Sequence, residues 1–362
     1  EEPFFGNLKK NIDNVKLRLS YGSLGNQQVG YYDYIQTINT NGTMNYIFGD
    51  QKKGSYASVS DPNSADLTWE TVSTWNVGLD LGFLNNRLNL TADAYVRDTK
   101  GMQTSGKKLP GAYGANEPKQ NAANLRTKGW ELMLTWNDAF KLANKPFRYN
   151  LSVGLADNTS EITKFDNPSK ILSDYYVGQK LGDIWGYVVD GLFRTDEEAA
   201  NYNVDQTAVN FVINTAQVNP GLHAGDMKFV DLDGDHTISS GSNTADDPGD
   251  RKIIGNSLPR YTYSIQGGFD WYGFDFSIYL QGVGHQDWYP GTNSVFFWGP
   301  YARPYSSFIP RDFLSQVWSP ENPDAYFPRP IGYLALGNNR SLGVVNDRYL
   351  QNLAYCRVKN IT

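Results

Sequence analysis

The stretch that decides the fold runs from Arg87 to Arg97 and reads RLNLTADAYVR. Apolar side chains alternate there with polar ones and occupy positions Leu88, Leu90, Ala92, Ala94 and Val96. A period of two places successive side chains on opposite faces of a strand. The stretch also has roughly the ten-residue length that a tilted strand needs to cross a bilayer. It therefore predicts a β-strand with one apolar face and one polar face.

Seven further segments repeat this alternation. Their ranges are Val15–Tyr21, Trp75–Leu81, Trp130–Trp136, Tyr149–Leu155, Tyr261–Phe269, Phe274–Leu280 and, more weakly, Leu350–Thr362. None of the 17 prolines of the chain falls inside the eight segments. Proline removes a backbone donor and is excluded from central strands. We therefore expect an all-β chain of about eight strands.

The connections between these strands alternate between short and long. The short ones cover residues 82–86, 137–145 and 272–273, and the long ones cover residues 23–66, 99–126, 158–258 and 284–348. One rim of the sheet then carries turns and the other carries long loops. This asymmetry is typical of a transmembrane antiparallel β-barrel with periplasmic turns and extracellular loops. A soluble sandwich or propeller has no reason to keep its long loops on one edge.

The two faces of the strands differ in a way that favours a barrel. Aromatic residues near the short-turn rim fit an interfacial girdle, although ordinary β-core packing is the alternative: Trp136, Phe147, Tyr149, Phe269, Trp271, Phe274 and Phe276. The opposite face carries charges that a dry core does not tolerate unpaired: Arg87, Asp93, Arg97, Glu131, Arg148, Arg260, Asp270 and Asp275. The sequence therefore predicts a lipid face and a wet lumen face.

Composition excludes several classes of protein. The formal net charge is −6 and no basic run is longer than a pair, so nucleic acid is not an expected partner. The single Cys356 and three widely spaced histidines exclude a Cys/His zinc cluster. No apolar run reaches 18 residues, so no transmembrane helix is predicted.

Six stretches of the chain resemble the C-terminal barrel of SusC/RagA-type TonB-dependent transporters. They are YGSLGNQ (21–27), LTWETVSTWNVGLDLGFLNNRL (67–88), LPGAYGANEPKQNAANLRTKGWEL (109–132), DYYVGQKLGDIWGYVVDGLF (174–193), GDRKIIGNSLPRYTYSI (249–265) and LQNLAYCRVKNIT (350–362). The resemblance implies a Gram-negative outer-membrane barrel of 22 strands with an N-terminal plug. It also implies a SusD-like surface lipoprotein as a lid and energy from the TonB-ExbB-ExbD complex.

On the plan of that family, residues 1–362 supply about eight of the 22 strands as a partial barrel domain. The chain begins at Glu1 rather than at Met and ends at Thr362 within an expected strand. We therefore expect a fragment of a longer protein, without the plug, the TonB box, the first barrel strands and the last ones.

An acidic segment in the third long connection resembles the start of a calcium loop. Asp231, Asp233 and Asp235 alternate along it, and carboxylates at alternate positions can converge on one hard cation. The segment departs from the EF-hand pattern because His236 stands where glycine is needed and Ser242 where the bidentate Glu belongs. A calcium site here would need a further acidic ligand, for which the candidates are Asp246, Asp247 and Asp250. The alternative is a turn rich in Asp and Gly without a metal, and no other cofactor is expected.

An aromatic segment in the last long connection is the candidate ligand-binding or lid-contact site. The candidates are Trp288, Tyr289, Phe297, Trp298, Tyr301 and Arg303, and Phe296 and Tyr305 lie in the same segment. Flat rings stack on the apolar faces of sugars, and a guanidinium donates to hydroxyl groups. The alternative is that these rings only fold the loop back on itself.

Catalysis is not expected, because the chain has no G-x-S-x-G, P-loop or H-E-x-x-H motif. The pair Glu197–Glu198 lies in a polar segment typical of a solvated surface rather than of a glycosidase. The resemblance to SusC/RagA-type transporters implies import of an oligosaccharide, with outer-membrane lipids around the barrel. Import of a peptide is the first alternative, and a secreted all-β glycan-binding or adhesin module is the second.

Overall fold

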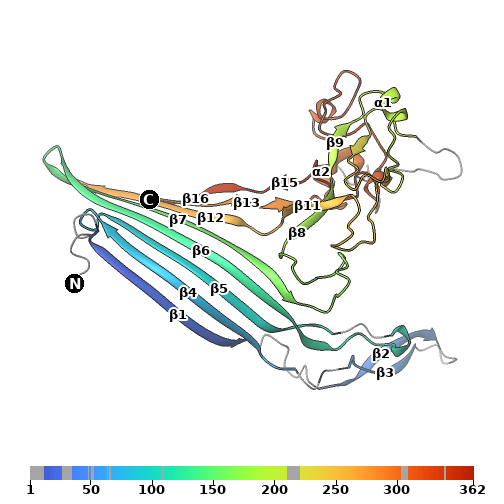
Figure 1. Cartoon of the computed structure of the whole chain (residues 1–362), viewed down its shortest axis with the longest axis horizontal. Coiled ribbons are helices and arrows are strands. Elements are labelled where there is room, and N and C mark those ends of the chain that lie inside the picture. The colour runs from blue at the N-terminus through green and yellow to red at the C-terminus, as the bar shows by residue number, and fades with distance from the viewer. Residues whose placement is uncertain are drawn as a thin grey trace.

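The computed structural model describes residues 12–26, 35–47, 49, 53–62, 64, 67–106, 110–209, 221–302, 309–337 and 340–362 (Figure 1). Its main feature is an eight-stranded antiparallel sheet in the order β1-β4-β5-β6-β7-β12-β13-β16. The strands are β1 (Asn14–Asn26), β4 (Glu70–Phe83), β5 (Leu88–Ser105), β6 (Lys119–Leu142), β7 (Lys145–Lys164), β12 (Arg260–Trp271), β13 (Phe274–His285) and β16 (Tyr355–Ile361). All eight expected strands are confirmed, each beside its neighbour in the chain.

The short turns lie together at one end of the sheet, and the long connections lie at the other end (Figure 1). Ala143 and Asn144 both have positive φ, as do Tyr272 and Gly273. Positive φ at both residues of a two-residue turn matches the right-handed twist of the flanking strands. Each of these turns therefore closes its hairpin without splaying the strands, and the expected division into a turn rim and a loop rim is confirmed.

β5, β6 and β7 extend furthest beyond their expected ranges, so the connection predicted over residues 99–126 is mostly paired strand. β5 continues to Ser105 and β6 starts at Lys119, and these two residues are partners in the register. β7 likewise continues to Lys164. Beyond the apolar band both faces of a hairpin lie in water, so the alternation of side chains disappears while the backbone pairing continues. The alternation therefore marks only the part of each strand within that band.

One face of the sheet presents continuous apolar rows. In one row Leu17 pairs with Leu79, Leu79 with Ala92, Ala92 with Leu132 and Leu132 with Leu155. Leu17 and Leu132 are exposed although they are large and apolar. A broad exposed apolar surface of this kind requires a non-aqueous environment. This face is therefore the lipid face.

A chain of aromatic rings crosses the lipid face beside the turns. Phe147 stacks on Phe269 with ring centroids 5.3 Å apart, and Phe269 stacks on Phe276 at 5.4 Å. Phe140 and Tyr149 extend the chain, the first at 5.0 Å from Phe147 and the second at 6.1 Å. Rings at this level fit the headgroup region of a membrane.

The opposite face pairs its charges. Arg18 Nη2 lies 3.0 Å from Asp80 Oδ1 and 2.8 Å from Asp93 Oδ2, so one guanidinium joins β1, β4 and β5. Arg260 departs from the expected face, because a positive φ at Tyr261 interrupts the alternation. Arg260 instead forms an ion pair with the buried Asp157, whose strand partner is Trp130 of the apolar face.

The remaining elements belong to the long connections. The small antiparallel pairs are β2 (Ile38–Ile47) with β3 (Lys53–Val59), β8 (Asp183–Tyr187) with β11 (Arg251–Asn256), β9 (Val189–Leu192) with β10 (Met227–Phe229), and β14 (Asp287–Trp288) with β15 (Gln351–Asn352). The helices are α1 (Asp196–Ala200) and α2 (Val295–Trp298), with 3-10 turns η2 (Gly111–Tyr113), η3 (Gly299–Tyr301), η5 (Phe313–Gln316) and η6 (Tyr333–Leu336). Within the described residues, no helix is both long and apolar enough to span a membrane.

Sidedness is testable with single cysteines on a background in which Cys356 is replaced by serine. Asn203, in the loops after β7, and Asn85, in the turn after β4, are both exposed. A membrane-impermeant maleimide applied to intact cells should label the variant Asn203→Cys and leave Asn85→Cys unlabelled until the outer membrane is opened. Equal labelling of the two cysteines on intact cells would contradict this topology.

Candidate functional site

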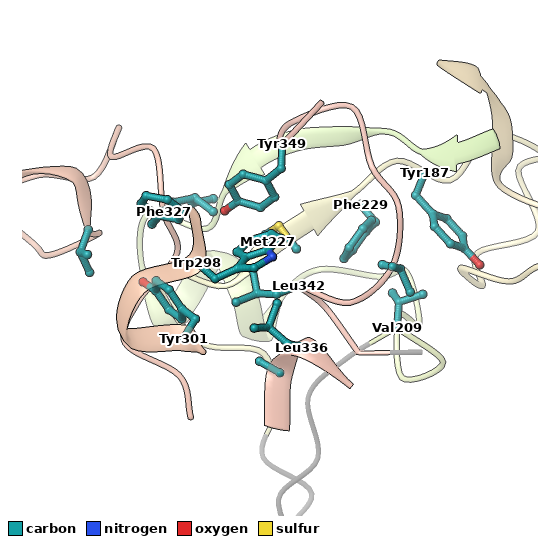
Figure 2. Packing of buried hydrophobic residues seen from close by; sticks show 14 of the residues in the cluster. Tyr187, Val209, Met227, Phe229, Trp298, Tyr301, Phe327, Leu336, Leu342 and Tyr349 are labelled. Carbon is teal, nitrogen blue, oxygen red and sulfur yellow. The ribbon is translucent and has the colours of Figure 1, made fainter. Parts of the chain in front are cut away.

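The long connections after β7 and β13 fold together into a hydrophobic core at the loop rim, here called the loop core (Figure 2). The labelled side chains point toward one another from segments more than a hundred residues apart. Its buried members are Tyr187, Leu192, Val209, Met227, Phe229, Ile238, Trp298, Tyr301, Ala302, Phe313, Val317, Phe327, Ala335, Leu336, Leu342, Val344 and Tyr349. The loop rim therefore carries a packed body beside the end of the sheet (Figure 1).

Trp298 and Tyr301 are at the centre of this loop core, with exposed fractions of 0% and 1%. Trp298 Nε1 donates to the carbonyl oxygen of Gly291 at 3.1 Å, and the Tyr301 hydroxyl donates to that of Pro328. Burial raises the pKa of Tyr301 well above its usual range. Neither side chain has more than 1% exposed surface here, so contact of Trp298 or Tyr301 with a ligand or a lid protein stays a prediction. They are aromatic because they fill the core.

The other predicted residues of this segment lie in different surroundings. Phe297 and Tyr289 pack against the loop core, and the Tyr289 hydroxyl donates to the Val344 carbonyl oxygen at 2.8 Å. Trp288 is 41% exposed, so its ring is accessible from solvent. Arg303 lies outside the described residues. Of the five candidates that the structure describes, Trp288 has the largest exposed fraction, and Tyr289 and Phe297 are partly exposed.

The acidic segment brings together three carboxylates, but not the three that were expected. Ligand atoms of Asp231, Asp233 and Asp250 lie within 4.8 Å of one another, and Asp235 is not in this group. Asp235 instead accepts from the backbone N–H of Thr237 at 2.7 Å. Asp250 is fully buried and accepts from the N–H groups of Leu232 and Ser239. Asp250 is one of the three acids that the sequence offered as a further calcium ligand.

Calcium binding by these carboxylates stays a prediction, and its pH dependence has a definite sign. Burial raises the pKa of Asp250, and the charges of Asp233 and Asp231 raise it further. The folded state then binds the Asp250 proton more tightly than the unfolded state. The stabilisation of the folded state by protonation of Asp250 is complete below the unfolded-state pKa. It is lost as pH rises through the folded-state pKa. At neutral pH a bound cation would offset the repulsion that remains.

We therefore expect millimolar CaCl2 at pH 7.5 to slow proteolysis of the loop core and to have less effect at pH 5. The protection should be lost in Asp233→Ala, which removes one exposed carboxylate ligand. Glu197→Ala, which removes an exposed acid of α1 outside the three-carboxylate group, is the matched control. Equal protease sensitivity with CaCl2 and with chelator at pH 7.5 would leave the cluster as a turn without a metal.

Sequence reasoning missed a cavity of about 1000 Å³ at the loop rim, here called the rim cavity. One wall is the far end of the β5–β6 hairpin and the other is the segment that follows β7. Its lining comprises Thr104, Ser105, Gly106, Glu117, Gln120, Asn121, Ala122, Lys164, Phe165, Asp166, Asn167, Pro168, Ser169, Ile171, Ser173, Asp174 and Tyr175. These residues follow no sequence period, because the cavity exists only where two separate connections meet.

Comparison with known proteins gives consistent results. The model of the family described as TonB dependent receptor-like, beta-barrel, matches residues 7–308. The chain is 28% identical over 290 residues to the TonB-dependent receptor P39 of Formosa agariphila, covering 74% of this chain and 26% of that protein. It is 28% identical over 368 residues to the TonB-dependent receptor SusC of Bacteroides thetaiotaomicron, covering 97% of this chain and 31% of SusC.

A solved structure has the same fold. The RagAB peptide importer in its open-open state superimposes with a TM-score of 0.67 at 19% identity, covering 97% of this chain and 33% of that one. The chain thus spans about a third or less of the length of these proteins. Outer-membrane location follows from the family, the two-faced sheet and the separation of turns from loops. The chain belongs to the TonB-dependent receptor β-barrel family, of the SusC/RagA type.

Proposed function

We propose that this chain is part of the barrel wall and extracellular mouth of a TonB-dependent importer of oligosaccharides. The observation that carries the proposal is the pairing of a two-faced sheet with a folded loop core at one rim only. The lipid face anchors the wall, and the charged face borders a water-filled lumen. The relatives are receptors and transporters rather than enzymes, so transport is the activity to expect.

The proposal includes three parts outside the described residues. An N-terminal plug would occlude the lumen, and the TonB-ExbB-ExbD complex would supply energy through it. A SusD-like lipoprotein would cover the loop rim, where Trp288 is exposed. On this view residues 1–362 supply eight of the barrel strands and other parts of the protein supply the rest.

An oligosaccharide is proposed as the substrate because accessible aromatic rings and polar side chains lie together at the loop rim. Trp288 is exposed there, and the rim cavity combines Phe165 and Tyr175 with hydroxyl, amide and carboxylate groups. Rings that stack on pyranose faces and acceptors that pair with hydroxyl groups suit a sugar. Peptide import is the alternative, favoured by the similarity in fold to the RagAB peptide importer.

Uptake by cells tests the proposal. A strain that lacks the whole transporter should lose uptake of at least one class of neutral oligosaccharide and keep uptake of oligopeptides. Restoring the gene should restore uptake, and inactivation of TonB should abolish it again. Undiminished oligosaccharide uptake in the deletion strain, or loss of peptide uptake alone, would contradict the proposal.

A further inference from the structure

We propose that the rim cavity is a binding subsite for an uncharged oligosaccharide, separate from the aromatic segment around Trp298. This inference rests on the proposed function and locates one place where the substrate is held. The cavity has a volume of about 1000 Å³, which is enough for several sugar rings. It lies at the loop rim, where a ligand from outside the cell first meets the protein.

The walls of the cavity are fixed before any ligand arrives. Asn167 is buried, accepts from the Ile171 N–H and donates to the carbonyl oxygens of Ile171 and Tyr175 at 3.0 Å each. Lys170 Nζ lies 2.6 Å from Asp246, which ties this wall to the connection that precedes β11. A preorganised site loses less conformational entropy on binding than a mobile loop does.

The opposite wall is fixed as well. The Gly106 N–H donates to the Pro118 carbonyl oxygen at 2.8 Å, which closes the hairpin beyond the last strand pair. Asn121 Nδ2 donates to the Thr68 carbonyl oxygen, and the Thr68 N–H donates back to Asn121 Oδ1. The hairpin end is therefore held against the segment that leads into β4.

Tyr175 supplies the stacking surface. Tyr175 is 52% exposed as a residue, and its ring meets Phe165 in a T-shaped contact with centroids 5.8 Å apart. Such a contact orients the Tyr175 ring and leaves much of it accessible. Carbohydrate C–H groups pack on aromatic faces, and a ring held in place does so at low entropic cost.

Polar groups around this ring suit hydroxyl groups. Among the described residues, Gln120 and Glu117 make no side-chain hydrogen bond to the protein, so both are available to a ligand. An amide offers donors and an acceptor, and a carboxylate accepts from two adjacent hydroxyl groups.

Charge selects against acidic ligands. Among the described residues of the lining, Glu117, Asp166 and Asp174 are acidic and Lys164 is basic. A uronic acid or a sulfated sugar bound beside Glu117 or Asp174 would meet a like charge. A peptide has backbone groups that pair with sheet edges and side chains that fill apolar pockets. The rim cavity is polar with accessible rings, so it suits a neutral sugar better than it suits a peptide.

The test uses the complete transporter purified with its lipoprotein partner and three classes of probe of similar length. Maltohexaose, xylohexaose and mannohexaose are the neutral probes, hexagalacturonic acid is the acidic probe, and a hexapeptide mixture is the third class. At least one neutral hexasaccharide should bind, and Tyr175→Ala should weaken its binding about tenfold. Gln120→Ala should weaken it less. Tyr113→Ala removes an exposed ring of the same hairpin outside the lining and should bind like the parent.

Each outcome decides between the claims. Unchanged binding in Tyr175→Ala, tighter binding of the acidic hexamer, or binding of the peptides alone would overturn the subsite. The absence of binding by every neutral hexasaccharide would overturn it as well. If Tyr175→Ala binds and imports like the parent while deletion of the transporter abolishes oligosaccharide uptake, the subsite is wrong and the proposed function stands.

Discussion

Replacing Trp298 by alanine is expected to unfold the loop core and to leave the barrel sheet assembled. The ring has no exposed surface, and its centroid lies 4.9 Å from that of Phe297 and 5.2 Å from that of Tyr349. Truncation opens a cavity and also orphans the Gly291 carbonyl oxygen that accepts from the indole. A buried Trp→Ala change costs about 3–5 kcal/mol, which is a large share of the stability of a small packed unit.

The measurement separates the two parts of the molecule. Protease added to intact cells should cut the loops of the Trp298→Ala variant, while heat-resistant migration in detergent gels should show a closed barrel. Leu314→Ala is the matched control, because Leu314 is 83% exposed on η5 and should tolerate truncation. Protease resistance equal to that of the parent would mean that Trp298 does not hold the loop core together.

Placing arginine at Leu134 is the second change with a large expected effect. Leu134 pairs with Leu90 on one side and with Val153 on the other, in the middle of the apolar rows. A guanidinium there would face the hydrocarbon of the bilayer, at a cost of about 2–4 kcal/mol that declines towards the membrane surfaces. The free energy of unfolding from lipid vesicles, measured in urea, should fall by this amount.

Thr91 provides the control on the other face of the same wall. It pairs with Asp80 and with Met133, and Asp93 is two residues away, so an arginine at Thr91 enters a wet and acidic environment. Thr91→Arg should therefore change the free energy of unfolding little. Equal penalties at Leu134 and Thr91 would indicate a sheet with water on both faces.

The sheet was predictable because its determinants are local. Alternation from Arg87 to Arg97 reports the environment of each side chain, and the same rule locates the other seven strands. Strand ends were less predictable. Gln103 and Asn121 pair where both faces lie in water, so their polarity looks like that of a loop.

The candidate site was harder to predict because it depends on long-range packing. Trp298 and Trp288 are equivalent as sequence letters, yet one is buried and the other is exposed. Asp250 replaces Asp235 in the acidic group because Asp250, which directly precedes β11, accepts from the N–H groups of Leu232 and Ser239 beside Asp231. Tyr175 was not predicted to contact a ligand, since the wall that faces it comes from a hairpin more than fifty residues earlier.

The length of β6 determines how far the loop rim lies from the membrane surface. Its 24 residues extend about 80 Å at the usual rise per residue. Even at the tilt of about 45° common in such walls, the strand rises roughly twice the height of the apolar band. The end of β6 at the loop rim therefore lies well outside the lipid headgroups. On the proposed function, an oligosaccharide would therefore meet the loop rim before it reaches membrane depth.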